Sequence, residues 1–196
     1  VRELALDRRS ELGRAALELF FRELFIWGEI QTDPNFGNYR IRIAGEEGAN
    51  SETDQIVLLD FGAVQAYSAS FLDPVIQMIR SSYEGDLPGV VDGGIRLRFM
   101  SQDWPEDVLD TFGKVCMSVL EPLSRDRSNW PDEAVNDRGQ YRWKQSDLPS
   151  RVARQAARSA ISRYFKVPPK EFVFLNRKLI GVYTFIAVLN AEFNGE

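Results

Sequence analysis

Apolar residues recur at three- and four-residue steps through the first 27 residues, with charged residues between them. This spacing predicts a long amphipathic helix from about Arg2 to Trp27, because such steps place apolar side chains on one helix face. Gly28 is expected to end it. The apolar positions are Leu4, Leu12, Ala15, Ala16, Leu19, Phe20 and Leu24.

Two short strands are predicted next. Residues 39–43 alternate polar and apolar side chains, and residues 55–59 form a mostly apolar run. The intervening polar stretch, 44–54, holds glycines and three acidic residues, so a β-hairpin with an exposed loop is expected. Those acids are more typical of a solvated tip than of a metal site; they are Glu46, Glu47 and Asp54.

The pattern is helical over most of the remaining chain. Helices are expected over 70–83, from about Asp86 with that residue as N-cap, over 101–123, over 149–165 and over 172–193. The predicted fold class is therefore α+β and mostly α, with one domain over residues 1–196.

Two regions of this helical part allow more than one interpretation. Residues 124–145 are polar yet hold Trp130, Tyr141 and Trp143, which either face a partner or membrane surface or, as we favour, pin a long connection to the core. Arginines on the 149–165 helix either bind acidic lipid head groups or, the favoured alternative, pair with acidic neighbours. They are Arg151, Arg154, Arg158 and Arg163.

The amino-acid composition excludes several classes of binding and catalytic site. A net charge of -5 gives no support to nucleic-acid binding. The chain has no histidine, which excludes serine–histidine catalysis and histidine-bound zinc within it, and the single Cys116 excludes an internal disulfide. The charged opening shows no signal peptide, and the longest weakly polar run, 179–189, is shorter than the roughly 20 residues of a spanning helix. Any catalysis is expected to rely on carboxylates, in an intracellular setting.

The candidate chemistry lies between residues 31 and 62. Asp33 stands five residues before Asn38, the spacing of the catalytic-loop Asp and Asn of protein kinases, and the triplet Asp60-Phe-Gly62 follows a predicted strand. Each motif alone is also an ordinary turn. Together they indicate a Mg²⁺ and nucleotide site, because Mg²⁺ takes oxygen ligands from one or two protein groups plus phosphates.

A family resemblance rests on these residues. The segment 25–38, with Gln-Thr-Asp-Pro-Asn-Phe-Gly-Asn at its end, and the segment 56–63 resemble the UbiB / aarF-domain-containing (ADCK) atypical kinases of the coenzyme Q type. The segments 169–172 and 176–181 are similar to that family's closing helix. The resemblance implies that Asp33 is the catalytic-loop acid and that Asn38 and Asp60 bind Mg²⁺ and, through it, ATP. Gln31 and Asn35 depart from typical kinases, which argues against protein phosphorylation.

The chain resembles only a kinase-like C-terminal lobe. No glycine-rich loop, strand lysine or Lys-x-Gly-Gln motif precedes the catalytic-loop candidate, so the fragment alone is expected to be inactive. For the full protein the resemblance implies an Mg²⁺-ATP-dependent ATPase or kinase that supports ubiquinone biosynthesis, with quinone lipids or an anionic membrane surface as candidate partners. It implies a place on the matrix side of the mitochondrial inner membrane in a eukaryote, and a membrane-associated cytoplasmic one otherwise.

Two other functions stay open from the sequence. One is a catalytically silent kinase-like module that binds lipid or protein partners through the tryptophan-containing region and the arginine helix. The other is a small-molecule kinase resembling the aminoglycoside phosphotransferases, which share the Asp and Asn spacing. The sequence leaves the phosphoryl acceptor and the oligomeric state open.

Overall fold

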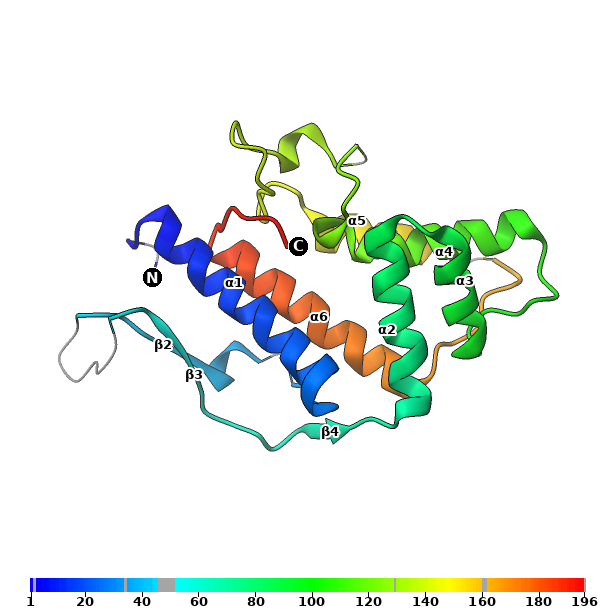
Figure 1. Cartoon of the computed structure of the whole chain (residues 1–196), viewed down its shortest axis with the longest axis horizontal. Helices are drawn as coiled ribbons and strands as arrows, with labels where there is room; N and C mark the ends of the chain where they lie inside the picture. Colours follow the sequence, from blue (N-terminus) through cyan, green and yellow to red (C-terminus); the bar gives the residue numbers. More distant parts are fainter. Residues whose placement is uncertain (2, 34, 46–51, 129, 160–161, 196) are drawn as a thin grey trace. The chain divides into compact units, whose positions relative to one another are not determined.

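The computed structural model describes residues 1, 3–33, 35–45, 52–128, 130–159 and 162–195. They form two compact units, each assembled from separate stretches of the chain. The first holds 1–66, 133–146 and 174–193, and the second holds 67–132, 147–173 and 194–196. The expectation of one domain over residues 1–196 stays a prediction. Helices dominate and the sheets are small and antiparallel, which agrees with the predicted α+β class (Figure 1).

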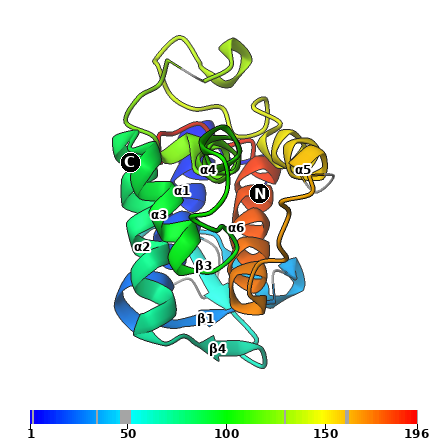
Figure 2. The same cartoon turned by 90° about the vertical axis from the view of Figure 1, so that its right-hand side faces the viewer.

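The first unit is built on two long helices that lie side by side (Figures 1 and 2). They are α1 (Leu6–Arg22) and most of α6 (Lys170–Val188). A π-helical turn, Glu23–Trp27, continues α1, and Gly28 ends it with a left-handed φ of 65°. The predicted first helix and its end are thus confirmed, although the regular helix begins at Leu6 rather than near Arg2.

The contact between α1 and the C-terminal segment is tight at Gly13. A Cβ built there would lie 2.9 Å from Phe193 Cε1 and 3.2 Å from Ile186 Cγ2. Both of these side chains are fully buried. They therefore have little room to move, and the absence of a side chain at Gly13 lets the two segments pack closely.

We expect Gly13→Ala to destabilise the protein by about 1–2 kcal/mol. Alanine favours a helix over glycine by about 1 kcal/mol, but overpacking a core costs about 1–3 kcal/mol. Urea unfolding measures the change. The exposed Ala15→Ser on the same helix is the control, with a change within about 0.5 kcal/mol, and equal stability of Gly13→Ala and the unchanged protein would contradict the packing argument.

Two separate two-stranded sheets complete the first unit. The predicted hairpin is confirmed as β2 (Tyr39–Arg42) paired antiparallel with β3 (Gln55–Leu58). A second pair, β1 (Glu29–Gln31) with β4 (Val64–Ala66), was not predicted. Strands of three residues are too short to show an alternating pattern, which explains why the sequence did not reveal them.

The acidic loop of the hairpin differs from the prediction at Asp54. Its side chain is only 6% exposed and receives two hydrogen bonds from the Arg8 guanidinium, at 2.5 and 2.9 Å. The expectation of a solvated Asp54 was wrong, because Arg8 in α1 lies within reach and pairs with it. The hydrogen bonds from Arg8 hold the pKa of this carboxyl below its usual value. Glu46 and Glu47 lie outside the described residues.

The second unit contains the remaining helices. They are α2 (Ala69–Glu84), α3 (Leu87–Arg96), α4 (Glu106–Val119) and α5 (Leu148–Ser159). A short 3₁₀ turn also lies there at Glu121–Leu123; another, Phe36–Asn38, belongs to the first unit, and Asp132–Ala134 lies where the chain passes from the second unit to the first. Asp86 caps α3 as predicted, since its side chain accepts a hydrogen bond from the Gly89 N–H. In the part of the chain described here, no helix combines the length and apolar character that crossing a bilayer requires.

The aromatic residues between 124 and 145 are buried, as the favoured alternative predicts. Trp130 donates its indole N–H to the Glu121 carbonyl, and Trp143 donates to the Phe193 carbonyl, both at 2.9 Å. Arg151 on α5 pairs with the Glu121 carboxylate at 2.6 and 2.8 Å, which confirms internal pairing for that arginine. These tryptophans are therefore not part of an exposed docking surface.

Candidate active site

Strand pairing brings the two sequence motifs side by side. The loop 32–38 connects β1 to β2, and the loop 59–63 connects β3 to β4. Because β1 pairs with β4 and β2 with β3, the two loops must run past each other in opposite directions. Main-chain bonds join them at both ends: Thr32 N–H donates to the Ala63 carbonyl at 3.0 Å, and Leu59 N–H donates to the Asn38 carbonyl at 2.9 Å.

Asp33 and Asn38 meet directly. Asn38 Nδ2 donates to Asp33 Oδ2 at 2.9 Å, and the Asn35 N–H donates to Asp33 Oδ1 at 3.3 Å. Asn35 in turn caps the 3₁₀ turn, accepting from the Gly37 N–H at 2.9 Å. The two residues that the five-residue spacing singled out are thus joined by a direct side-chain hydrogen bond, which closes the loop between them.

Gln31 bridges the two loops with its side-chain amide. Its Nε2 donates to the Asp60 carbonyl at 2.8 Å, and its Oε1 accepts from the Asp33 N–H at 3.1 Å. The residue is only 7% exposed. Sequence reasoning noted Gln31 as a departure from typical kinases but missed this role, since a hydrogen bond across 29 positions leaves no mark in local spacing.

The donor set fits a Mg²⁺ ion that also binds phosphates. Asp60 is exposed, and its Oδ1 accepts from the Gly62 N–H at 2.7 Å. The Asn38 amide nitrogen donates to Asp33, so a cation would meet only the amide oxygen of Asn38. Among the described residues no three carboxylate, histidine or cysteine side chains gather into a metal cluster. One carboxylate and one amide are enough only where substrate phosphates and water complete the shell.

A buried ion pair contacts the two residues that flank the loop 32–38, Gln31 and Tyr39. Lys178 of α6 places its Nζ 3.2 Å from Glu23 Oε2, and the two side chains are 2% and 5% exposed. Burial raises the pKa of the Glu23 carboxyl, while Lys178 and a hydrogen bond from the Gln31 main chain act to lower it. The sequence analysis missed both residues, although each interrupts an apolar helix face: Glu23 lies three residues after Phe20, and Lys178 lies three residues after Leu175.

Comparison with known proteins connects this geometry to a family. Residues 3–92 match the model of the ABC1 atypical kinase-like domain. The chain is 30% identical over 183 residues to the mitochondrial atypical kinase coq-8 of Caenorhabditis elegans, covering 93% of this chain and 22% of the relative. It is 26% identical over 190 residues to the mitochondrial atypical kinase COQ8B of Rattus norvegicus, covering 96% and 32%. Over 189 residues it is 22% identical to the mitochondrial atypical kinase COQ8 of Saccharomyces cerevisiae, covering 95% and 33%.

The chain thus spans between a fifth and a third of the length of these curated relatives. Almost all of it is covered by each match, so the likeness includes both compact units and not the motif loops alone. With the paired motif loops described above, these similarities show that the chain belongs to the UbiB (ADCK) family of atypical kinases.

Proposed function

We propose that this chain is the C-terminal catalytic lobe of a UbiB-like ATPase or atypical kinase. The full protein binds Mg²⁺-ATP and supports the biosynthesis of ubiquinone or a related isoprenoid-quinone lipid. The observation that carries the proposal is the meeting of the two loops, in which Asn38 bonds Asp33 and Gln31 bonds the Asp60 main chain. Turns that merely end strands would have no need of this cross-bridging.

Each site residue has a distinct role in this proposal. Asn38 and Asp60 hold Mg²⁺ through their side-chain oxygens, and Mg²⁺ supplies charge neutralisation at the nucleotide phosphates. Asp33 orients the attacking hydroxyl or water, because its carboxylate is held in place by the Asn35 and Asn38 donors. Two acceptors fit this arrangement, and we favour water over a protein hydroxyl because Gln31 and Asn35 depart from the protein-kinase pattern.

Exposed apolar side chains near the site support the proposal that another lobe completes it. Phe61 of the Asp-Phe-Gly triplet is 60% exposed, and Trp27 at the end of the π-helical turn is 54% exposed. The curated relatives are also much longer than this chain, which covers 22% to 33% of their length, so a protein of that size has room for a further lobe. We infer that a phosphate-holding lobe of the full protein lies against this region and that the fragment alone is inactive.

The relatives' names support the proposed setting. The matched proteins from the worm, the rat and yeast are all named mitochondrial atypical kinases. Those names support a mitochondrial setting only. Within it we propose the matrix side of the inner membrane for the full protein if its source is a eukaryote, and otherwise a cytoplasmic membrane surface. Quinone lipids and anionic lipid are the proposed partners there.

The test of this function is Asp60→Asn in the intact protein. Loss of the charged ligand is expected to weaken Mg²⁺-dependent ATP binding at least tenfold, on the order of what removal of a metal's supporting partners costs. Calorimetric titration with ATP at fixed Mg²⁺ measures it. The exposed Asp103→Asn is the control for loss of a carboxylate elsewhere. Unchanged affinity and unchanged ATP turnover in Asp60→Asn would refute the assignment.

A further inference from the structure

We propose that the buried Glu23–Lys178 ion pair anchors both ends of the loop that carries Asp33 and Asn38, and so positions the candidate active site. The inference rests on the proposed function, because it assigns a purpose to the geometry of that same loop. The polar contacts of the two residues are with each other and with Gln31 and Tyr39. Both are positioning residues, acting through Gln31 at one end of the loop and Tyr39 at the other.

Glu23 anchors the first end. It lies on the π-helical turn that follows α1, and the Gln31 main-chain N–H lies close enough to its carboxylate to act against the rise in the Glu23 pKa. Gln31 then contacts the Asp33 N–H and the Asp60 carbonyl with its side chain. A shift of Glu23 would therefore move the residue that sets the distance between the two motif loops.

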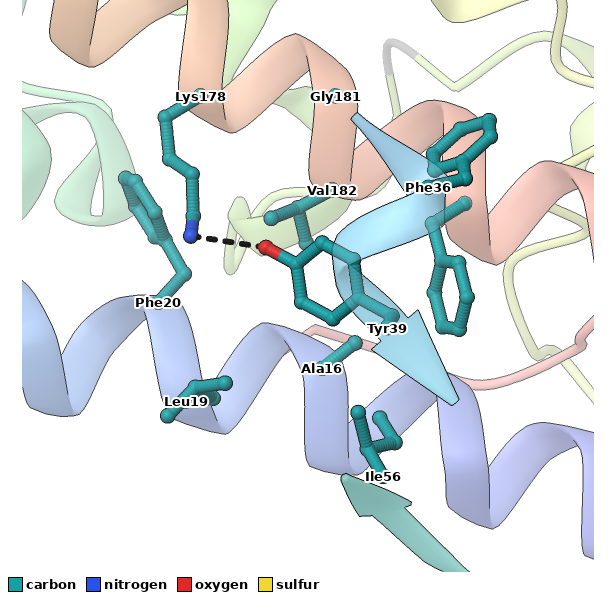
Figure 3. Close-up of a pocket in the computed structure, with 10 residues that line it drawn as sticks. Ala16, Leu19, Phe20, Phe36, Tyr39, Ile56, Lys178, Gly181 and Val182 are labelled. Atoms are coloured by element: carbon teal, nitrogen blue, oxygen red, sulfur yellow. Dashed lines mark hydrogen bonds between the residues drawn. The ribbon is translucent and has the colours of Figure 1, made fainter. Parts of the chain in front are cut away.

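Lys178 anchors the second end. Its ammonium donates to the Tyr39 hydroxyl at 3.1 Å, and Tyr39 follows Asn38 directly. Figure 3 shows Lys178 reaching from α6 toward the Tyr39 hydroxyl. The Tyr39 and Phe36 rings each lie 6.0 Å from the Phe185 ring, centroid to centroid, so the end of the loop also packs on α6.

The side chains around Lys178 and Tyr39 are closely packed. The cavity that Tyr39 and Lys178 line with apolar side chains of α1 and α6 has a volume of about 20 Å³, room for about one water molecule (Figure 3). It is too small to be a nucleotide or lipid site. Closely packed side chains therefore surround the two anchoring contacts, and a change at the pair has few ways to relax other than through the loop.

The choice of charged residues here also points to positioning. A buried ion pair seldom stabilises a protein more than well-packed apolar side chains would, because both charges lose their hydration. Its directional hydrogen bonds can instead specify one arrangement of the groups that it contacts. Here those groups are the main chain of Gln31 and the hydroxyl of Tyr39, one at each end of the loop.

Two double variants of the intact protein separate positioning from stability. Glu23→Gln with Lys178→Met removes both charges but keeps an acceptor for the Gln31 N–H. Glu23→Met with Lys178→Met removes the charges and the acceptor, with side chains of similar length. We expect the Met/Met variant to show a kcat for Mg²⁺-ATP about 10- to 100-fold below that of the Gln/Met variant. Their melting temperatures should be similar.

Amide hydrogen exchange gives a second readout that needs no nucleotide. The Gln31 N–H should exchange faster in the Met/Met variant than in the Gln/Met variant, because only the latter retains its acceptor. Equal kcat and equal exchange in the two variants would overturn the proposal and make the pair purely structural. If the unchanged protein turned over no ATP, the proposed function would fail. The exchange rate of the Gln31 N–H would still test whether Glu23 anchors that end of the loop.

If the Met/Met variant does not fold, Tyr39→Phe tests the proposal instead. It removes only the hydroxyl that Lys178 contacts and keeps the ring on Phe185. We expect its kcat to fall at least about threefold with an unchanged KM for ATP, as for a small displacement of a reacting group. An unchanged kcat would contradict anchoring by Lys178.

Discussion

Asp33→Asn is expected to lower the kcat of the intact protein for Mg²⁺-ATP by about 10²- to 10⁴-fold, the usual contribution of a positioned acid–base group. Asparagine keeps the size of the side chain and one acceptor oxygen, so the loop should retain much of its shape. It cannot accept a proton from the attacking group as a carboxylate does. The effect should therefore fall on kcat rather than on the KM for ATP.

Phosphate release measured at saturating ATP checks this expectation. Asp103→Asn again serves as the control, since it removes an exposed carboxylate from the second unit. Circular dichroism and melting curves establish that Asp33→Asn is folded. A kcat within about threefold of the unchanged protein would show that Asp33 does not act as an acid–base group.

We expect Lys178→Met to lower the free energy of unfolding by about 3–5 kcal/mol near neutral pH, because it leaves the Glu23 charge buried without its cation. This loss is larger than the one expected for Gly13→Ala. The double variant Glu23→Gln with Lys178→Met should recover most of that loss, since no charge is then buried. Urea unfolding of both variants measures the difference. Equal stability of the single and double variants would contradict the argument.

The same variant should show a characteristic dependence on pH. Burial already raises the pKa of Glu23 above its ordinary value of 4.5, and removal of Lys178 takes away an interaction that lowers it. A carboxyl with a raised folded-state pKa binds its proton more tightly when folded. Stability is then retained below the unfolded pKa and lost as the pH rises toward the folded one. The unfolding free energy of Lys178→Met should therefore fall more steeply than that of the unchanged protein above about pH 4.5.

The candidate site was only partly visible in the sequence. Asp33, Asn38 and Asp60 could be named because five-residue spacing and a three-residue motif are local features, readable without a fold. Their proposed ligand and acid roles stay predictions. The sequence marked Gln31 only as a departure from typical kinases. Its bridging role was missed because its amide donates to the Asp60 carbonyl, 29 positions along the chain.

The sequence by itself determined the long helices, the β2–β3 hairpin and the loops on which the candidate chemistry lies. Helical periodicity, Gly28 at the helix end and the Asp86 cap depend on neighbours within a few residues, and the structure retains all three.

Only the tertiary structure decided which distant groups meet. It paired the three-residue strands β1 and β4, placed Arg8 against Asp54, and buried Lys178 beside Glu23, 155 positions away. These contacts depend on how α1, α6 and the two small sheets pack, and burial then makes pairing of each charge necessary. Local periodicity in the sequence shows neither how these elements pack nor which charges become buried.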